Sequence, residues 1–254
     1  MTLHYKKLGE GKPLLILHGL FGSLDNWMTL AKEWSNQHEV WLIDQRNHGQ
    51  SPHSNDFSYT VMAQDLDSFI QEHQIYQPTI IGHSMGGKTA MEFAVNSPES
   101  VGQLIVVDIA PVSYQVHHYA IIEALESVKL DQVKSRKEVD EIISSTIHEF
   151  GVRQFLLKNL YWKEKEQLAW RFNLSAIKKE IIPISEWSIS EKQYKGKSLF
   201  IKGGASEYIL PEYSKDISVK FPNYILEEVE NAGHWVHAEK KEAFKSIIDQ
   251  FLSQ

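Results

Sequence analysis

The feature that most constrains the fold is a repeated alternation of short apolar runs and amphipathic segments in the first half of the chain. The apolar runs are Leu14–Leu17, Val40–Ile43, Thr79–Ile81 and Leu104–Val107. A continuous apolar run of this length is typical of a strand that is buried on both faces of a sheet. The segments between the runs carry apolar residues at helical spacing. We therefore predict an α/β fold with a mostly parallel central sheet and helices on both faces.

The alternation stops after Pro111 and returns near residue 198. Between about 112 and 191 the pattern is helical, with no convincing strand, and the expected helices are Ala120–Leu130, Glu138–Phe150 and Arg153–Leu160. The later strands are expected at Ser198–Lys202 and Tyr224–Val229, with helices at Tyr213–Phe221 and Glu239–Leu252. We predict one domain over residues 1–254, with a helical cap inserted at about 112–191.

Composition excludes several classes of function. The chain has a formal net charge of −7 and no cysteine. An acidic chain without a basic stripe does not suit nucleic-acid binding or docking on an anionic membrane. No signal-peptide core and no window of membrane-spanning length is found, so a cytoplasmic protein is expected. No glycine-rich nucleotide motif follows a strand, so we predict no cofactor.

A serine stands where a predicted strand meets a predicted helix. The stretch Gly82-His83-Ser84-Met85-Gly86 matches G-x-S-x-G. Small residues on either side of such a serine let the strand and helix approach closely, and the hydroxyl then projects above the carboxyl edge of the sheet. We predict that Ser84 is a nucleophile.

A serine nucleophile needs a base, and the chain has 12 histidines. His234 is favoured because it lies in the loop after the last predicted strand, at the same edge of the sheet. His237 is expected in the first turn of the following helix, and His18 and His83 are expected to serve structure. A metal site at His117–His118 is not favoured, because no further ligand stands at suitable spacing.

The third member of a triad is a buried carboxylate that orients the histidine. Two acidic residues follow predicted strands, Asp108 and Glu207. The stretch after the later strand, Gly203-Gly-Ala-Ser206, has a serine three residues after its first glycine, and Glu207 stands one residue further on. We favour Asp108 over Glu207, with Ser206 as a possible hydrogen-bonding partner.

An oxyanion hole needs two backbone N–H donors. One donor is expected from Met85, which follows the nucleophile. The other is expected from Leu20, in the loop after the first apolar run, with Phe21 as the second choice.

Five stretches together resemble the α/β-hydrolase superfamily, and more closely the bacterial YbfF-type serine esterases. They are HGLFGSLDNW from His18, DQRNHGQS from Asp44, GHSMGGK from Gly82, DIAPV from Asp108 and GHWVHAEK from Gly233. The resemblance implies that the acid comes from the DIAP segment, which is Asp108, and that serine fills the usual aspartate position, which is Ser206. It also implies hydrolysis of short acyl esters, with thioesterase activity on acyl-CoA.

The expected function is cleavage of carboxylic esters with short to medium acyl chains, including acyl-CoA thioesters, through an acyl-serine intermediate. Phe155, Trp187 and Trp235 are candidates to line the substrate pocket. A carbon–carbon bond hydrolase on the same triad and a non-catalytic ligand receptor on the same fold remain open, as does a monomer or a homodimer. Arg46–Gly49 is interpreted as a turn-stabilising loop, and Lys88 as a packing or solvent-facing residue.

Overall fold

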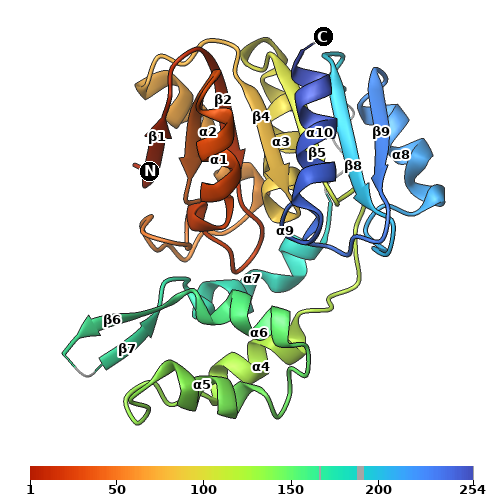
Figure 1. The fold of residues 1–254 in the computed structure, drawn as a ribbon. Helices are drawn as coiled ribbons and strands as arrows, with labels where there is room; N and C mark the ends of the chain where they lie inside the picture. The colour runs from red at the N-terminus through yellow and green to blue at the C-terminus, as the bar shows by residue number, and fades with distance from the viewer. Residues whose placement is uncertain (166, 188–191, 254) are drawn as a thin grey trace.

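A seven-stranded sheet forms the centre of the computed structural model, which describes residues 1–165, 167–187 and 192–253 (Figure 1). The strand order is β1-β3-β2-β4-β5-β8-β9. The strands are β1 (Tyr5–Leu8), β2 (Lys12–Leu17), β3 (His38–Ile43), β4 (Thr79–His83), β5 (Gln103–Val107), β8 (Ser198–Gly203) and β9 (Tyr224–Val229). All neighbours pair in parallel except β1, which pairs antiparallel with β3. The mostly parallel sheet expected from the apolar runs is confirmed.

Strand β1 was not expected, and its sequence explains why. Its four residues, YKKL, include two lysines and are only partly buried. A strand at the edge of a sheet has only one strand neighbour, so it does not need the continuous apolar run that identifies the inner strands.

Helices cover both faces of the sheet. One face packs against α1 (Met28–Trp34) and α10 (Lys241–Leu252), and the other packs against α2 (Tyr59–Glu72), α3 (Met85–Asn96) and α8 (Ser214–Lys220). Alternate residues of β2 divide between the two layers: Leu14 and Ile16 join the first, whereas Leu15 and Leu17 join the second. The single C-terminal helix expected from Glu239 is preceded by a separate short helix, α9 (Val236–Glu239).

The elements between β5 and β8, which we call the cap, lie beyond one end of the sheet (Figure 1). They are α4 (Tyr119–Ser127), α5 (Arg136–Ile143), α6 (Phe150–Leu157), β6 (Leu160–Glu164), β7 (Gln167–Trp170) and α7 (Leu174–Ser185). The end of the expected insertion, residues 188–191, lies outside the described residues. The cap has its own apolar core, to which Phe21 and Met85 of the sheet domain contribute.

Two expectations about the cap were wrong. It contains an antiparallel hairpin, β6–β7, where no strand was expected, because the strands are short, β6 ends in charged residues, and apolar alternation is weak. The helix expected over Glu138–Phe150 ends at Ile143. Ser144 and Ser145 donate their hydroxyl hydrogens to backbone carbonyls three residues earlier, which competes with helix continuation.

Among the described residues, no helix combines the length and the apolar character that crossing a bilayer requires.

Candidate active site

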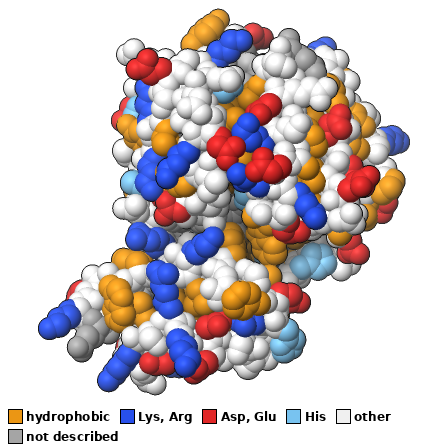
Figure 2. All heavy atoms as spheres, in the orientation of Figure 1, with side chains coloured by type: hydrophobic (Ala, Val, Ile, Leu, Met, Phe, Trp, Pro, Cys, Tyr) orange, Lys and Arg blue, Asp and Glu red, His pale blue; other side chains and the backbone are white. Residues whose placement is uncertain are grey.

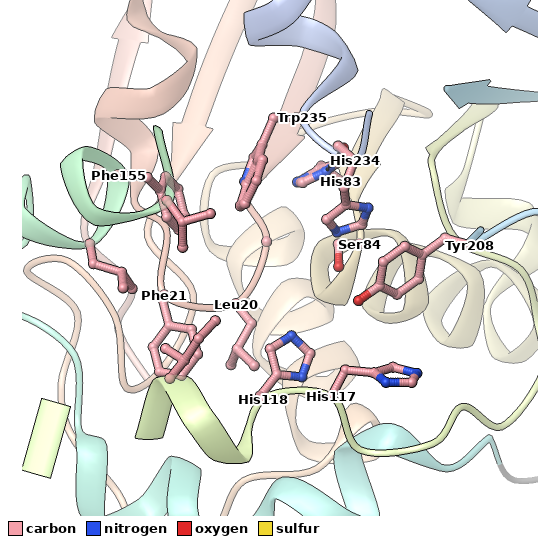
Figure 3. Close-up of a pocket in the computed structure, with 14 residues that line it drawn as sticks. Leu20, Phe21, His83, Ser84, His117, His118, Phe155, Tyr208, His234 and Trp235 are labelled. Carbon is pink, nitrogen blue, oxygen red and sulfur yellow. Dashed lines mark hydrogen bonds between the residues drawn. The ribbon is translucent and has the colours of Figure 1, made fainter. Parts of the chain in front are cut away.

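Ser84 stands on a strained turn between β4 and α3. Its backbone angles are φ +52° and ψ −116°, which a non-glycine residue rarely adopts. A Cβ on Gly82 would lie 2.3 Å from the carbonyl oxygen of Gly86, and a Cβ on Gly86 would lie 2.5 Å from that of Leu17. The glycines therefore allow the strand and the helix to meet closely enough to form the turn. The Ser84 hydroxyl lies in a pocket at the carboxyl end of the sheet (Figure 3).

The carboxylate of Asp108 lies behind this pocket and is fully buried. It accepts three hydrogen bonds: from His234 Nδ1 at 2.7 Å, from Ser206 Oγ at 2.5 Å and from Gly203 N at 2.9 Å. Asp108 itself has φ +50°, a second strained position directly after a strand. Because a carboxylate only accepts hydrogen bonds, the hydrogen of neutral His234 is on Nδ1. Its Nε2 is left with a lone pair that can take a proton.

Glu207, the alternative acid, is exposed to solvent. The structure therefore brings His234 to Asp108 and leaves Glu207 on the surface. Ser206 occupies the position suggested by the sequence, with its hydroxyl on Asp108 Oδ2.

The backbone N–H groups at the mouth of the pocket, next to Ser84, differ in whether they already donate a hydrogen bond. Met85 is the first residue of α3, so its N–H has no partner within the helix. The N–H of Leu20 has no backbone partner among the described residues. The N–H of Phe21 donates to His48 Nε2 at 3.2 Å, so Phe21 is not available as the second-choice donor.

Three histidines behind the mouth hold its loops in place as neutral rings. His18 donates from Nδ1 to the Gly19 carbonyl and accepts the Gln45 N–H on Nε2. His48 donates to the Arg46 carbonyl, and burial together with the nearby His18 lowers the pKa of His48 to about 3. His83 donates from Nε2 to the His234 carbonyl at 2.8 Å, and burial holds the pKa of His83 well below its usual value.

The loop Arg46–Gly49 contacts neighbouring chain segments and does not line the pocket at Ser84. The Arg46 guanidinium forms an ion pair with Asp65 at 2.6 Å and donates to the Asp56 carbonyl. This agrees with the interpretation of a turn-stabilising loop.

The main pocket has a volume of about 210 Å³ and is mostly apolar. Phe155 from α6 and Trp235, beside His234, both line it, with their ring centroids 5.6 Å apart (Figure 3). Trp187, the third expected lining residue, is not part of this pocket. It is buried in the sheet domain's apolar core, with its ring near Tyr59 and Lys88.

A second, narrow pocket of about 40 Å³ also reaches Ser84. Three residues that were not expected at the site line it: Lys88, His118 and Tyr208. The ring of Tyr208 stacks on that of His234 with centroids 4.0 Å apart. Its position two residues after Ser206 is the one sequence signal that could have indicated it, whereas nothing local marks Lys88 or His118.

Comparisons with known proteins agree on one family. A family model described as "alpha/beta hydrolase fold" matches residues 12–135. The chain is 38% identical to esterase YbfF of Escherichia coli (strain K12), over 96% of this chain and 94% of that protein. It is 39% identical to the sn-1-specific diacylglycerol lipase ABHD11 of Mus musculus, over 94% of this chain and 80% of that protein.

Among solved structures, one described as a marine microorganism esterase superposes with a TM-score of 0.96 at 42% identity, covering 98% of both chains. The expected resemblance is confirmed by the sheet topology and by these relatives together. The chain belongs to the α/β-hydrolase family, as a hydrolase of the esterase and lipase type.

Proposed function

We propose that this chain hydrolyses carboxylic esters through an acyl-serine intermediate, with Ser84 as the nucleophile, His234 as the base and Asp108 as the acid that orients it. The observation that carries the proposal is the 2.7 Å contact between His234 Nδ1 and Asp108 Oδ2, in a pocket shared by His234 and a strained Ser84. That contact fixes the tautomer in which His234 Nε2 can accept the serine proton.

The proposed reaction has two halves. His234 Nε2 takes the Ser84 hydroxyl proton while Oγ attacks the carbonyl carbon, and the Leu20 and Met85 N–H groups donate to the oxyanion. As the intermediate collapses, His234 gives its proton to the leaving alcohol, and acyl-Ser84 remains. Water then attacks the acyl carbon with His234 as base, which releases the acid and restores Ser84.

Ser206 supports Asp108 in this proposal. Its hydroxyl donates to the same oxygen that accepts from His234, and Gly203 N donates to the other. These two donors hold the buried carboxylate in the orientation that faces His234. We assign Ser206 to positioning Asp108, since it is not placed to contact the ester.

The pockets support short to medium acyl chains, because the narrow pocket is small and the main pocket is lined by apolar side chains. Thioesters would follow the same steps with a thiol as leaving group. The face in Figure 2 carries many lysine and arginine side chains on the cap, which would suit a leaving group with phosphates such as coenzyme A. The names of the relatives, an esterase and a diacylglycerol lipase, support the ester reaction.

The test is intact mass after incubation with a fluorophosphonate probe, with Ser84→Ala as the control. One equivalent of label that is lost in the variant would support an activated Ser84. Absence of label on the folded wild-type protein would contradict the proposal and favour a ligand receptor. A labelled protein would then be assayed on esters and acyl-CoA thioesters of increasing chain length, and on diketones to detect carbon–carbon hydrolysis.

A further inference from the structure

The two pockets that meet at Ser84 differ in one respect that orients an ester. His234 lines the main pocket but not the narrow one. In the proposed reaction His234 must give its proton to the leaving oxygen, so the alcohol lies on the His234 side. The acyl group then extends from Ser84 into the narrow pocket.

The narrow pocket contains a buried lysine. Lys88, on α3 one turn after Ser84, is only 2% exposed. Its Nζ donates to the backbone carbonyls of Ser185 and Glu186, both at 3.2 Å, at the end of α7. No carboxylate of the described chain lies within ion-pair distance of this ammonium group. An ammonium has three N–H donors, so these two carbonyls leave one donor for another acceptor.

The described side chains around Lys88 carry no negative charge that could balance its ammonium group. Three aromatic rings surround Nζ: Tyr114 at 4.9 Å, Tyr59 at 5.5 Å and Trp187 at 6.0 Å from the ring centroids. Burial raises the pKa of both tyrosines, so their hydroxyls stay neutral. Burial also lowers the pKa of Lys88 to about 7, which an anion beside it would reverse.

A second polar group, from the cap, lines the same pocket. His118 precedes α4, and its Nδ1 is buried with no hydrogen-bond partner among the described residues. His118 also lines the main pocket, where Figure 3 shows its ring across from Ser84 and close to Leu20. Burial lowers the pKa of His118 to about 4, so it is a neutral ring that can donate one N–H.

We infer that the narrow pocket is a subsite for a short acyl group that ends in a carboxylate, as in a monoester of a short dicarboxylic acid. Lys88 supplies the charge for that carboxylate and His118 a hydrogen bond from the cap. The inference rests on the proposed function, because it assigns the acyl side of that same reaction. A purely hydrocarbon acyl end of equal size would leave His118 Nδ1 and the third N–H of Lys88 without an acceptor or donor from the substrate.

The test compares two esters of benzyl alcohol that differ only at the acyl end. Benzyl hydrogen succinate carries a carboxylate, and benzyl 4-methylpentanoate carries an isopropyl group of similar size. Hydrogen bonds to a charged group predict a kcat/KM roughly 10- to 100-fold higher for the succinate. Lys88→Met keeps the length of the side chain without its charge and should remove this preference, mainly through KM. Lys215→Met, at an exposed position on α8, is the control and should retain it.

A measurement without any variant covers the case in which Lys88→Met does not fold. Succinate should inhibit hydrolysis of p-nitrophenyl acetate by the wild-type enzyme at roughly tenfold lower concentration than 4-methylpentanoate does. Equal inhibition, or a wild-type preference for the neutral ester, would overturn the subsite while Ser84 labelling leaves the hydrolase intact. Failure of labelling and of both ester assays would instead refute the proposed function itself, and the subsite with it.

Discussion

The two walls of the pocket are built differently. On the sheet side, Asp108 accepts three hydrogen bonds, and both ring nitrogens of His18 and of His48 are bonded to backbone groups. On the cap side, the lining residues are mostly apolar, and His118 Nδ1 has no partner within the described chain. The sheet side is therefore organised to hold a few groups in fixed positions, whereas the cap side is organised to receive a ligand.

The cap also joins the sheet domain through several polar contacts. Asn159 donates to the Phe21 carbonyl at 2.7 Å, the Asn173 N–H donates to the Asn47 carbonyl at 2.8 Å, and Lys88 bonds the end of α7. The contact at Phe21 reaches a loop that lines the pocket. The difference between the walls suggests that changes to the groups that hold Asp108 and His234 act on kcat, while changes to the cap and to Lys88 act on KM and selectivity.

The largest expected effect is on the sheet side, at Asp108. Asp108→Asn should lower kcat by about 10⁴-fold, because the amide no longer stabilises the imidazolium or fixes the Nδ1–H tautomer of His234. Glu207→Gln is the matched control, one acidic residue changed to its amide at an exposed position, and should stay within about twofold of wild type. The measurement is steady-state hydrolysis of p-nitrophenyl acetate by both variants. The reverse ranking would move the acid to the later strand.

Most of the sheet-side wall could be predicted from the sequence, because the positions of its residues follow from the geometry of a parallel sheet. Asp108 and His234 are 126 residues apart, yet each follows a strand, and the carboxyl ends of parallel strands meet at one edge. The strand–serine–helix turn is likewise local, since the glycines that permit it stand beside Ser84.

The residues that could not be predicted depend on packing between distant segments. A lysine one turn into a helix is usually expected to face solvent. Lys88 is instead buried, because the end of α7 and the ring of Trp187 pack against it. Phe21 N–H looked available until the fold placed His48 against it. In the β6–β7 hairpin, β6 has five residues of which two are charged, and β7 has only four residues, so neither strand is long enough for a clear period of two.

The second expected effect is a loss of stability in mild acid. Burial lowers the pKa of His48 and of His237 to about 3, and lowers those of His18 and His83. In the unfolded chain these histidines bind protons as the pH falls through about 6.5, whereas in the folded chain the buried rings stay neutral. Their contribution to the free energy of unfolding is therefore complete above about pH 6.5 and is lost toward about pH 3. Between pH 7 and pH 5, His48 and His237 should each lower the free energy of unfolding by about 2 kcal/mol.

This expectation is checked by urea unfolding between pH 7 and pH 5. His237 stacks on Trp27 at 4.2 Å, and its Nδ1 is buried without a partner in the described chain, so His237→Phe is a suitable variant. The pH dependence of its unfolding free energy should be shallower than that of wild type by about one proton. An unchanged slope would show that His237 does not contribute to the acid sensitivity.

A smaller effect is expected at His83, which links two parts of the sheet-side wall. Its Nε2–H holds the carbonyl of His234, and a Cβ on Gly19 would lie 2.8 Å from its Nδ1. His83→Ala should lower kcat roughly 10- to 100-fold, because the His234 loop loses one of its fixed contacts. His83→Gln can still donate and should recover part of the loss. Unchanged kcat in both variants would show that the loop is held without this bond.

The smallest effect is expected on the cap side, at Phe155. Its ring lines the main pocket beside Trp235, where we place the alcohol of the ester. Phe155→Ala should raise KM for benzyl esters roughly three- to tenfold, since losing the apolar contact of a partly buried ring costs about 1 kcal/mol. The kcat should stay near wild type, because no group that holds Ser84, His234 or Asp108 is altered. Trp162→Ala removes an exposed ring from β6 and serves as the control. A large fall in kcat for Phe155→Ala would show that the cap helps to position the reacting groups, and the division between the two walls would no longer hold.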